Sequence, residues 1–71
     1  MDSSATIQLN GTARTLKNQS LTISGLLAEV GLTGVPVLVE WNGTALFPRE
    51  FPTTILAEGD KLEIIRIVAG G

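Results

Sequence analysis

The last ten residues constrain the fold more than any other stretch of this 71-residue chain. Four β-branched residues stand close together there: Ile64, Ile65, Ile67 and Val68. Side chains of this shape suit a pleated, half-buried strand. Because the apolar run is nearly unbroken, it predicts a strand inside a sheet, with both faces at least partly covered. Gly70 and Gly71 then have nothing to pack, so residues 69–71 are expected to form a flexible tail.

Size and composition predict one small domain, residues 1–71. A domain of this length buries only about 60% of its unfolded surface, and small cores often depend on disulfides or a metal. The sequence contains no Cys and no His, which excludes a disulfide, the common zinc sites and His-based catalysis. The core must therefore come from the 44% of residues that are apolar.

Charge and hydropathy narrow the choice of partners. Five basic and seven acidic residues give a net charge of −2, and the basic ones are scattered, unlike those of a nucleic-acid-binding protein. No stretch approaches the roughly 18 apolar residues of a membrane span. The polar N-terminus lacks the basic start of a signal peptide. We therefore expect a cytoplasmic protein, monomeric when free, with neither nucleic-acid nor membrane partners.

Two Asn-Gly pairs predict hairpins, because both central residues of a type I′ turn need positive φ. Strands are expected on either side of each turn, at residues 5–9, 12–16, 35–41 and 44–47. The weak apolar pattern of the second strand indicates a sheet edge. Carboxylates are expected to be solvated surface groups at Glu40, Glu50, Glu58, Asp60 and Glu63.

One helix is expected at residues 23–30. Its apolar stripe follows helical spacing: Ile23, Leu26, Leu27 and Val30. Thr22 suits the N-cap, Leu21 could pack on Leu26 as a hydrophobic staple, and Gly31 suits the left-handed C′ position. Residues 51–56 are expected to be irregular, with room for one short helical turn. Phe51 with either Ile55 or Leu56 should close the bottom of the core.

The order hairpin, helix, hairpin and final strand predicts an α+β fold. One main helix would pack on one face of a mixed sheet of four to five strands. This is the β-grasp, or ubiquitin-like, pattern.

Several short motifs add a family resemblance. Asn42-Gly43 is followed by Pro48-Arg49-Glu50, then by Glu58-Gly59-Asp60, and the chain ends in Val68-Ala69-Gly70-Gly71. In this order and at this length, the motifs resemble the ThiS-like sulfur carriers of thiamine biosynthesis. The segment between Asn42-Gly43 and Pro48 is slightly longer than is usual for that family. The resemblance implies the β-grasp fold, with the last strand parallel to the first.

The resemblance also implies a protein co-substrate rather than an enzyme. A ThiF-like adenylating enzyme would use MgATP to activate the Gly71 carboxylate, which is ionised at neutral pH. Sulfur relayed from cysteine by a desulfurase would then give a thiocarboxylate, and thiazole synthase would accept the sulfur. Gly70, Ala69 and Val68 would guide the tail, and the carrier itself would hold no cofactor or metal.

Three alternatives stay open from the sequence. The same chemistry serves the small subunit of molybdopterin synthase and other sulfur carriers. A ubiquitin-like modifier would transfer the activated carboxyl group to a protein amine instead. The last alternative is a β-grasp interaction module with an inert tail.

The alternation of the final strand predicts a partner-binding surface. Leu62 and Ile64 best fit the face that the helix covers. Ile65 and Ile67 should then lie on the other face, with Leu38 beside them. Exposed aliphatic side chains next to a reactive tail would form a docking patch.

Overall fold

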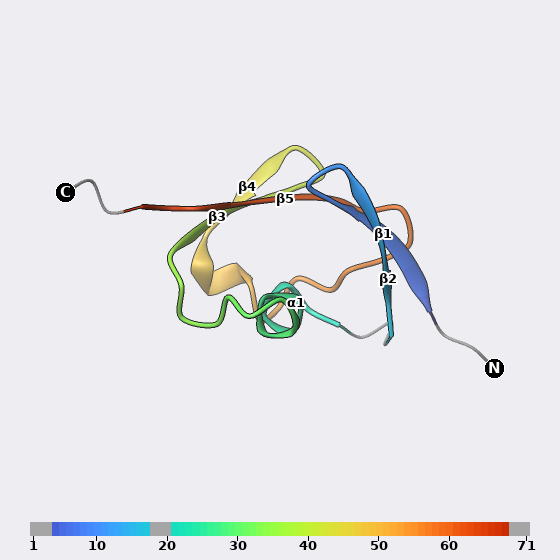
Figure 1. Cartoon of the computed structure of the whole chain (residues 1–71), viewed down its shortest axis with the longest axis horizontal. Coiled ribbons are helices and arrows are strands. Elements are labelled where there is room, and N and C mark those ends of the chain that lie inside the picture. The colour runs from blue at the N-terminus through green and yellow to red at the C-terminus, as the bar shows by residue number, and fades with distance from the viewer. Residues whose placement is uncertain (1–3, 18–20, 69–71) are drawn as a thin grey trace.

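The computed structural model describes residues 4–17 and 21–68. The elements within them are β1 (Ala5–Leu9), β2 (Thr12–Leu16), α1 (Ile23–Glu29), β3 (Val37–Trp41), β4 (Thr44–Leu46), the 3₁₀ turn η1 (Pro48–Glu50) and β5 (Lys61–Arg66). The strands form one sheet in the order β2-β1-β5-β3-β4, with α1 against one face (Figure 1). β5 runs parallel to β1 and antiparallel to β3. The predicted α+β, β-grasp architecture is therefore confirmed.

Both hairpins turn at the predicted Asn-Gly pairs. The φ angles are 50° at Asn10 and 82° at Gly11, and 50° at Asn42 and 83° at Gly43. Positive φ at both central residues matches the right-handed twist of the strands that follow. β2 lies at a sheet edge, as its weak apolar pattern indicated.

The N-terminus of α1 is capped as predicted. Thr22 Oγ1 accepts a hydrogen bond of 3.1 Å from Gly25 N. Leu21, which precedes the cap, packs against the core and crosses closely over Gly25. A Cβ atom at Gly25 would lie 2.6 Å from Leu21 Cδ1. Gly25 thus lowers helix propensity but leaves room for the Leu21 side chain.

The C-terminus of α1 lies one residue before the expected end, with Val30 as the C-cap. Gly31 has a φ of 78° and donates through its N–H to Ala28 O, while Leu32 N donates to Leu27 O at 2.7 Å. This pair of bonds is the Schellman motif that a glycine at C′ allows. No helix within residues 4–17 and 21–68 is long and apolar enough to cross a membrane.

One core cluster fills the space between α1 and the sheet. Its members are Ile7, Leu16, Ile23, Leu26, Leu27, Val37, Val39, Phe51, Leu56, Leu62 and Ile64. At the bottom of the core, Leu56 is buried with Phe51, whereas the Ile55 side chain is 59% exposed. The helical turn expected within residues 51–56 instead lies earlier, at Pro48–Glu50.

The third strand begins at Val37, two residues later than expected. Val35 N donates to Leu32 O at 3.0 Å, which ties this residue to the loop after α1 rather than to a neighbouring strand. Pro36, which has no N–H to donate, separates that loop from β3.

The final strand lies inside the sheet, as expected, but only one of its faces is buried, and the other is covered only in small part. Leu62 and Ile64 are buried, but Glu63 and Ile65 are exposed. The unbroken apolar run is typical of a strand buried on both faces. In this sheet α1 lies on one face, and none of the described elements packs over the other at β5 (Figure 1).

A side chain extends the contact between β1 and β5. The two strands pair only at Gln8–Lys61 and Leu9–Leu62, because the chain turns at Asn10. Asn10 N still donates to Leu62 O at 2.9 Å. The Asn10 amide then accepts from Ile64 N at 2.8 Å and donates to Ile64 O at 3.2 Å. The Asn10 side chain therefore makes the two hydrogen bonds to β5 that the backbone of one further β1 residue would make.

This arrangement predicts that Asn10→Gly destabilises the protein by about 1–2 kcal/mol, the worth of two partly buried hydrogen bonds. Glycine accepts the positive φ of this position, so the turn itself should persist. Asn10→Asp should recover part of the loss, since a carboxylate still accepts from Ile64 N. Urea unfolding measures the difference, and a glycine variant as stable as the wild type would contradict the bridging role.

Candidate functional site

Three of the predicted tail residues, Ala69, Gly70 and Gly71, lie outside the described residues. The structure describes the strand that leads to them. The last hydrogen bond of that strand runs from Ile67 N to Pro36 O at 2.9 Å. Val68 follows with 84% of its surface exposed, and this end of the chain extends beyond the rest of the domain (Figure 1). The described part of the chain therefore leads away from the core as far as Val68.

The beginning of β5 is held by a carboxylate. Asp60 Oδ2 accepts from Trp41 Nε1 at 3.0 Å and from Ala57 N at 2.9 Å, and Oδ1 accepts from Asn42 Nδ2 at 3.1 Å. Partial burial alone would raise the pKa of Asp60, but the three donors outweigh it, so its pKa lies below the ordinary 3.8. Asn42 Oδ1 also accepts from Lys61 N at 2.8 Å.

Other carboxylates of the family motifs also bond to the backbone. Glu58 Oε1 accepts from Thr6 N at 2.8 Å, and Glu50 Oε2 accepts from Phe47 N at 2.6 Å, at the start of η1. The Arg49 guanidinium lies 4.9 Å from the centre of the Phe47 ring. Glu58 is exposed and Glu50 and Asp60 are partly exposed, as expected of surface carboxylates, but each of them also accepts a hydrogen bond from the backbone. The positions of these carboxylates in the sequence do not by themselves indicate which backbone groups they bond to.

Two residues of the predicted docking patch come together. Leu38 on β3 and Ile65 on β5 are direct cross-strand partners, 57% and 56% exposed. They lie on the face opposite α1, as the alternation predicted. Ile67, which is 48% exposed, lies past the end of β5 and lines a hollow that neither of the other two reaches.

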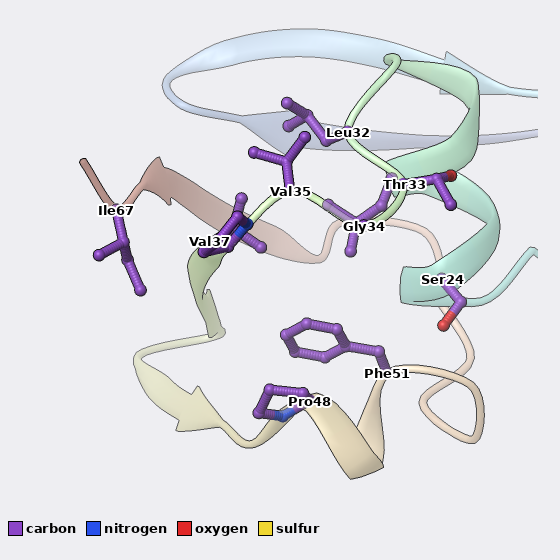
Figure 2. A pocket seen from close by; sticks show the side chains of 11 residues that line it. Ser24, Leu32, Thr33, Gly34, Val35, Val37, Pro48, Phe51 and Ile67 are labelled. Carbon is purple, nitrogen blue, oxygen red and sulfur yellow. The ribbon is translucent and has the colours of Figure 1, made fainter. Parts of the chain in front are cut away.

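Figure 2 shows that hollow with the side chains that line it. It has a volume of about 450 Å³ and lies between the loop after α1, the segment around Pro48 and Phe51, and Ile67. Its lining contains no titratable side chain, and the hydroxyl groups of Ser24 and Thr33 are its polar side-chain groups. It can accommodate an apolar group but offers no acid or base. Separately, no three carboxylates of the described residues gather as a metal site would require.

Comparison with known proteins identifies the family. The sequence profile of the ThiS family matches residues 7–71. The chain belongs to the ThiS family. A search of curated proteins found no match. Among solved structures, the chain is similar to the crystal structure of the thiamine biosynthesis protein ThiS from Geobacter metallireducens. The TM-score is 0.79 at 29% identity, and the alignment covers 93% of this chain and 99% of the other. The predicted family and fold are both confirmed.

The three hydrogen bonds that the Asp60 carboxylate accepts predict that an Asp60 variant and the wild type differ in stability by an amount that depends on pH. Because the folded-state pKa is depressed, the carboxylate stabilises the fold above the unfolded pKa, and this contribution is lost as pH falls through the folded pKa. Asp60→Asn should therefore cost about 1–2 kcal/mol at pH 7. The gap to the wild type should close as the pH falls below about 3.8. Unfolding by urea at several pH values measures this, and a gap independent of pH would contradict it.

Proposed function

We propose that the protein is a sulfur carrier of thiamine biosynthesis, a co-substrate acted on by partner enzymes rather than an enzyme. The observation that carries this proposal is the match to the ThiS family, which extends through the terminal Gly70-Gly71 pair. The similar structure from Geobacter metallireducens, a thiamine biosynthesis protein, supports the same role.

The proposed reaction begins at the Gly71 carboxylate. One of its oxygens attacks the α-phosphorus of MgATP on a ThiF-like adenylating enzyme, and pyrophosphate leaves. Sulfur from cysteine, relayed by a desulfurase, then attacks the acyl carbon as the C–O bond to AMP breaks. A persulfide donor would leave an acyl disulfide, which a second thiol reduces to the thiocarboxylate. The product is a stronger nucleophile than a carboxylate and passes its sulfur to thiazole synthase.

The fold suits a carrier because the last described residues, which lead to the proposed reactive end, lie outside the core. β5 is hydrogen-bonded to strands on both sides, and the core contribution of the described C-terminal segment ends at Ile64. Beyond the exposed Val68, the two glycines could pass through a cleft too narrow for side chains. Activation therefore needs no rearrangement of the folded domain.

Deletion of Gly71 should abolish sulfur loading. After incubation with adenylating enzyme, ATP and a sulfur donor, the wild type should gain the mass difference between sulfur and oxygen, measured on the intact protein. The deletion variant should show no gain yet keep its melting temperature. A variant that still acquires sulfur would show that the reactive carboxylate is assigned wrongly. Formation of isopeptide-linked products in place of a thiocarboxylate would indicate a ubiquitin-like modifier.

Gly70→Val tests whether the tail must pass through a narrow cleft of the adenylating enzyme. The terminal carboxylate stays in place in this variant. The branched side chain should block adenylation, measured by ATP–pyrophosphate exchange. Its effect on stability should stay within about 0.5 kcal/mol, as for most surface substitutions. Gly70→Ala provides a smaller step and should retain more activity. A large fall in melting temperature would mean that Gly70 is packed in the fold.

Ile65→Asp tests the docking patch. Because Ile65 is 56% exposed and faces away from α1, the variant should keep a melting temperature close to that of the wild type. Its affinity for the adenylating enzyme or for thiazole synthase should fall, measured by isothermal titration calorimetry. The matched variant Ile55→Asp changes an aliphatic residue that is 59% exposed, in the loop before β5. Equal losses from both variants would contradict a patch centred on Ile65.

A further inference from the structure

The two Asn-Gly turns are places where this chain can react without an enzyme. The backbone nitrogen of a glycine can attack the side-chain amide carbon of the asparagine before it, and a glycine has no Cβ to hinder the attack. The pair occurs at both hairpin tips, Asn10-Gly11 and Asn42-Gly43. Both asparagines are exposed, and φ is 50° at each. Local sequence and turn geometry are therefore alike, so a difference in reactivity must come from the contacts of the two side chains.

The Asn10 amide is held by a residue inside the sheet. Its Oδ1 accepts from Ile64 N at 2.8 Å and its Nδ2 donates to Ile64 O at 3.2 Å. Both bonds are partly buried, and Ile64 itself is a core residue that is 8% exposed. To reach Gly11 N, the amide must leave both bonds at once. Two backbone groups would then lose their partner where water has little access, which is costly.

The Asn42 amide is held by exposed groups instead. Its Oδ1 accepts from Lys61 N at 2.8 Å, and its Nδ2 donates to Asp60 Oδ1 at 3.1 Å. Both bonds are exposed, so water can replace the amide at each end. The Asp60 carboxylate also keeps its bonds to Trp41 and Ala57 when the amide departs. Release of the Asn42 side chain therefore costs less than release of the Asn10 side chain.

We propose that Asn42 is a site of spontaneous deamidation in the folded protein, and that the contacts with Ile64 protect Asn10. Gly43 N forms a bond to Asn42 Cγ as the Cγ–Nδ2 bond breaks, and ammonia leaves with the proton that Gly43 N gives up. The product is a five-membered succinimide ring. Water then adds to one of the two ring carbonyl groups and opens the ring. The residue at position 42 becomes an aspartate or an isoaspartate.

Either product would disturb the start of β5. In an aspartate, an oxygen takes the place of the Nδ2 that now lies 3.1 Å from Asp60 Oδ1, so a hydrogen bond gives way to repulsion between two carboxylates. An isoaspartate adds one carbon atom to the backbone of a two-residue turn, which does not match the pairing of β3 with β4. Deamidation at Asn42 therefore weakens the contacts that join this hairpin to β5.

The test is to incubate the purified protein in mildly alkaline buffer and to follow both sites by peptide mapping with mass spectrometry. Asn42 should convert about tenfold faster than Asn10, because leaving the Ile64 backbone groups unpaired costs more than exposing Lys61 N to water. In urea, where the contacts are lost, the two sites should convert at similar rates. The variant Asn42→Asp, which mimics one product, should have a lower melting temperature than the wild type.

Asp60→Asn tests the part played by the contact at Asn42. A neutral acceptor holds the Asn42 amide less firmly than a carboxylate does, so conversion at Asn42 should be about threefold faster in this variant. Conversion at Asn10 should stay unchanged, which makes Asn10 the control within the same molecule. Equal acceleration at both sites would mean that the reaction passes through global unfolding, and it would overturn the proposal.

The wild-type rates alone can also overturn the inference. Equal conversion at the two sites of the folded protein would contradict it, and so would faster conversion at Asn10. So would an unreacted Asn42 in the folded protein after a time in which the urea-unfolded protein converts. The experiment needs no partner enzyme, so its result is independent of the proposed role as a sulfur carrier.

Discussion

The pairing of β5 between β1 and β3 is the interaction on which the rest of the structure depends. The last strand joins two hairpins that would otherwise each be a marginal two-stranded unit. It supplies Leu62 and Ile64 to the core. It also fixes where the chain leaves the domain, because Ile67 N is still bonded to Pro36 O. The stability of the sheet and the path of the chain up to Ile67 therefore follow from the same set of hydrogen bonds.

Short polar side chains complete this pairing where the backbone cannot. Asn10 bonds to both backbone groups of Ile64, and Asn42 bonds to Lys61 N. Asp60 ties the loop before β5 to β3 through Trp41. Each asparagine thus has the positive φ that its turn requires, and its side chain also accepts a hydrogen bond from β5. A 71-residue domain without disulfides gains cross-links in this way that its small core does not supply.

The two faces of the sheet have different roles. The face under α1 holds the apolar core, and substitutions there act on stability. The opposite face carries the exposed pairs Leu38–Ile65 and Glu40–Glu63 on β3 and β5, and contributes little to folding. A carrier that meets partner enzymes can therefore vary this face without losing its fold. The hollow beside Phe51 and Ile67 is a separate apolar feature at the end of the domain where the chain leaves.

The sequence by itself determined the strands and the helix to within two residues, the turn types and the caps of α1, because each depends on patterns within a few neighbouring residues. The family followed from the order of short motifs along the chain. Positive φ at Asn10-Gly11, for example, follows from the pair itself. Tertiary structure decided that Leu56 rather than Ile55 enters the core, that Asn10 bridges to Ile64, and that Glu40 lies opposite Glu63. These contacts depend on the register between segments far apart in the chain. Local propensity carries no information about that register; the packing of α1 on one face of the sheet selects it.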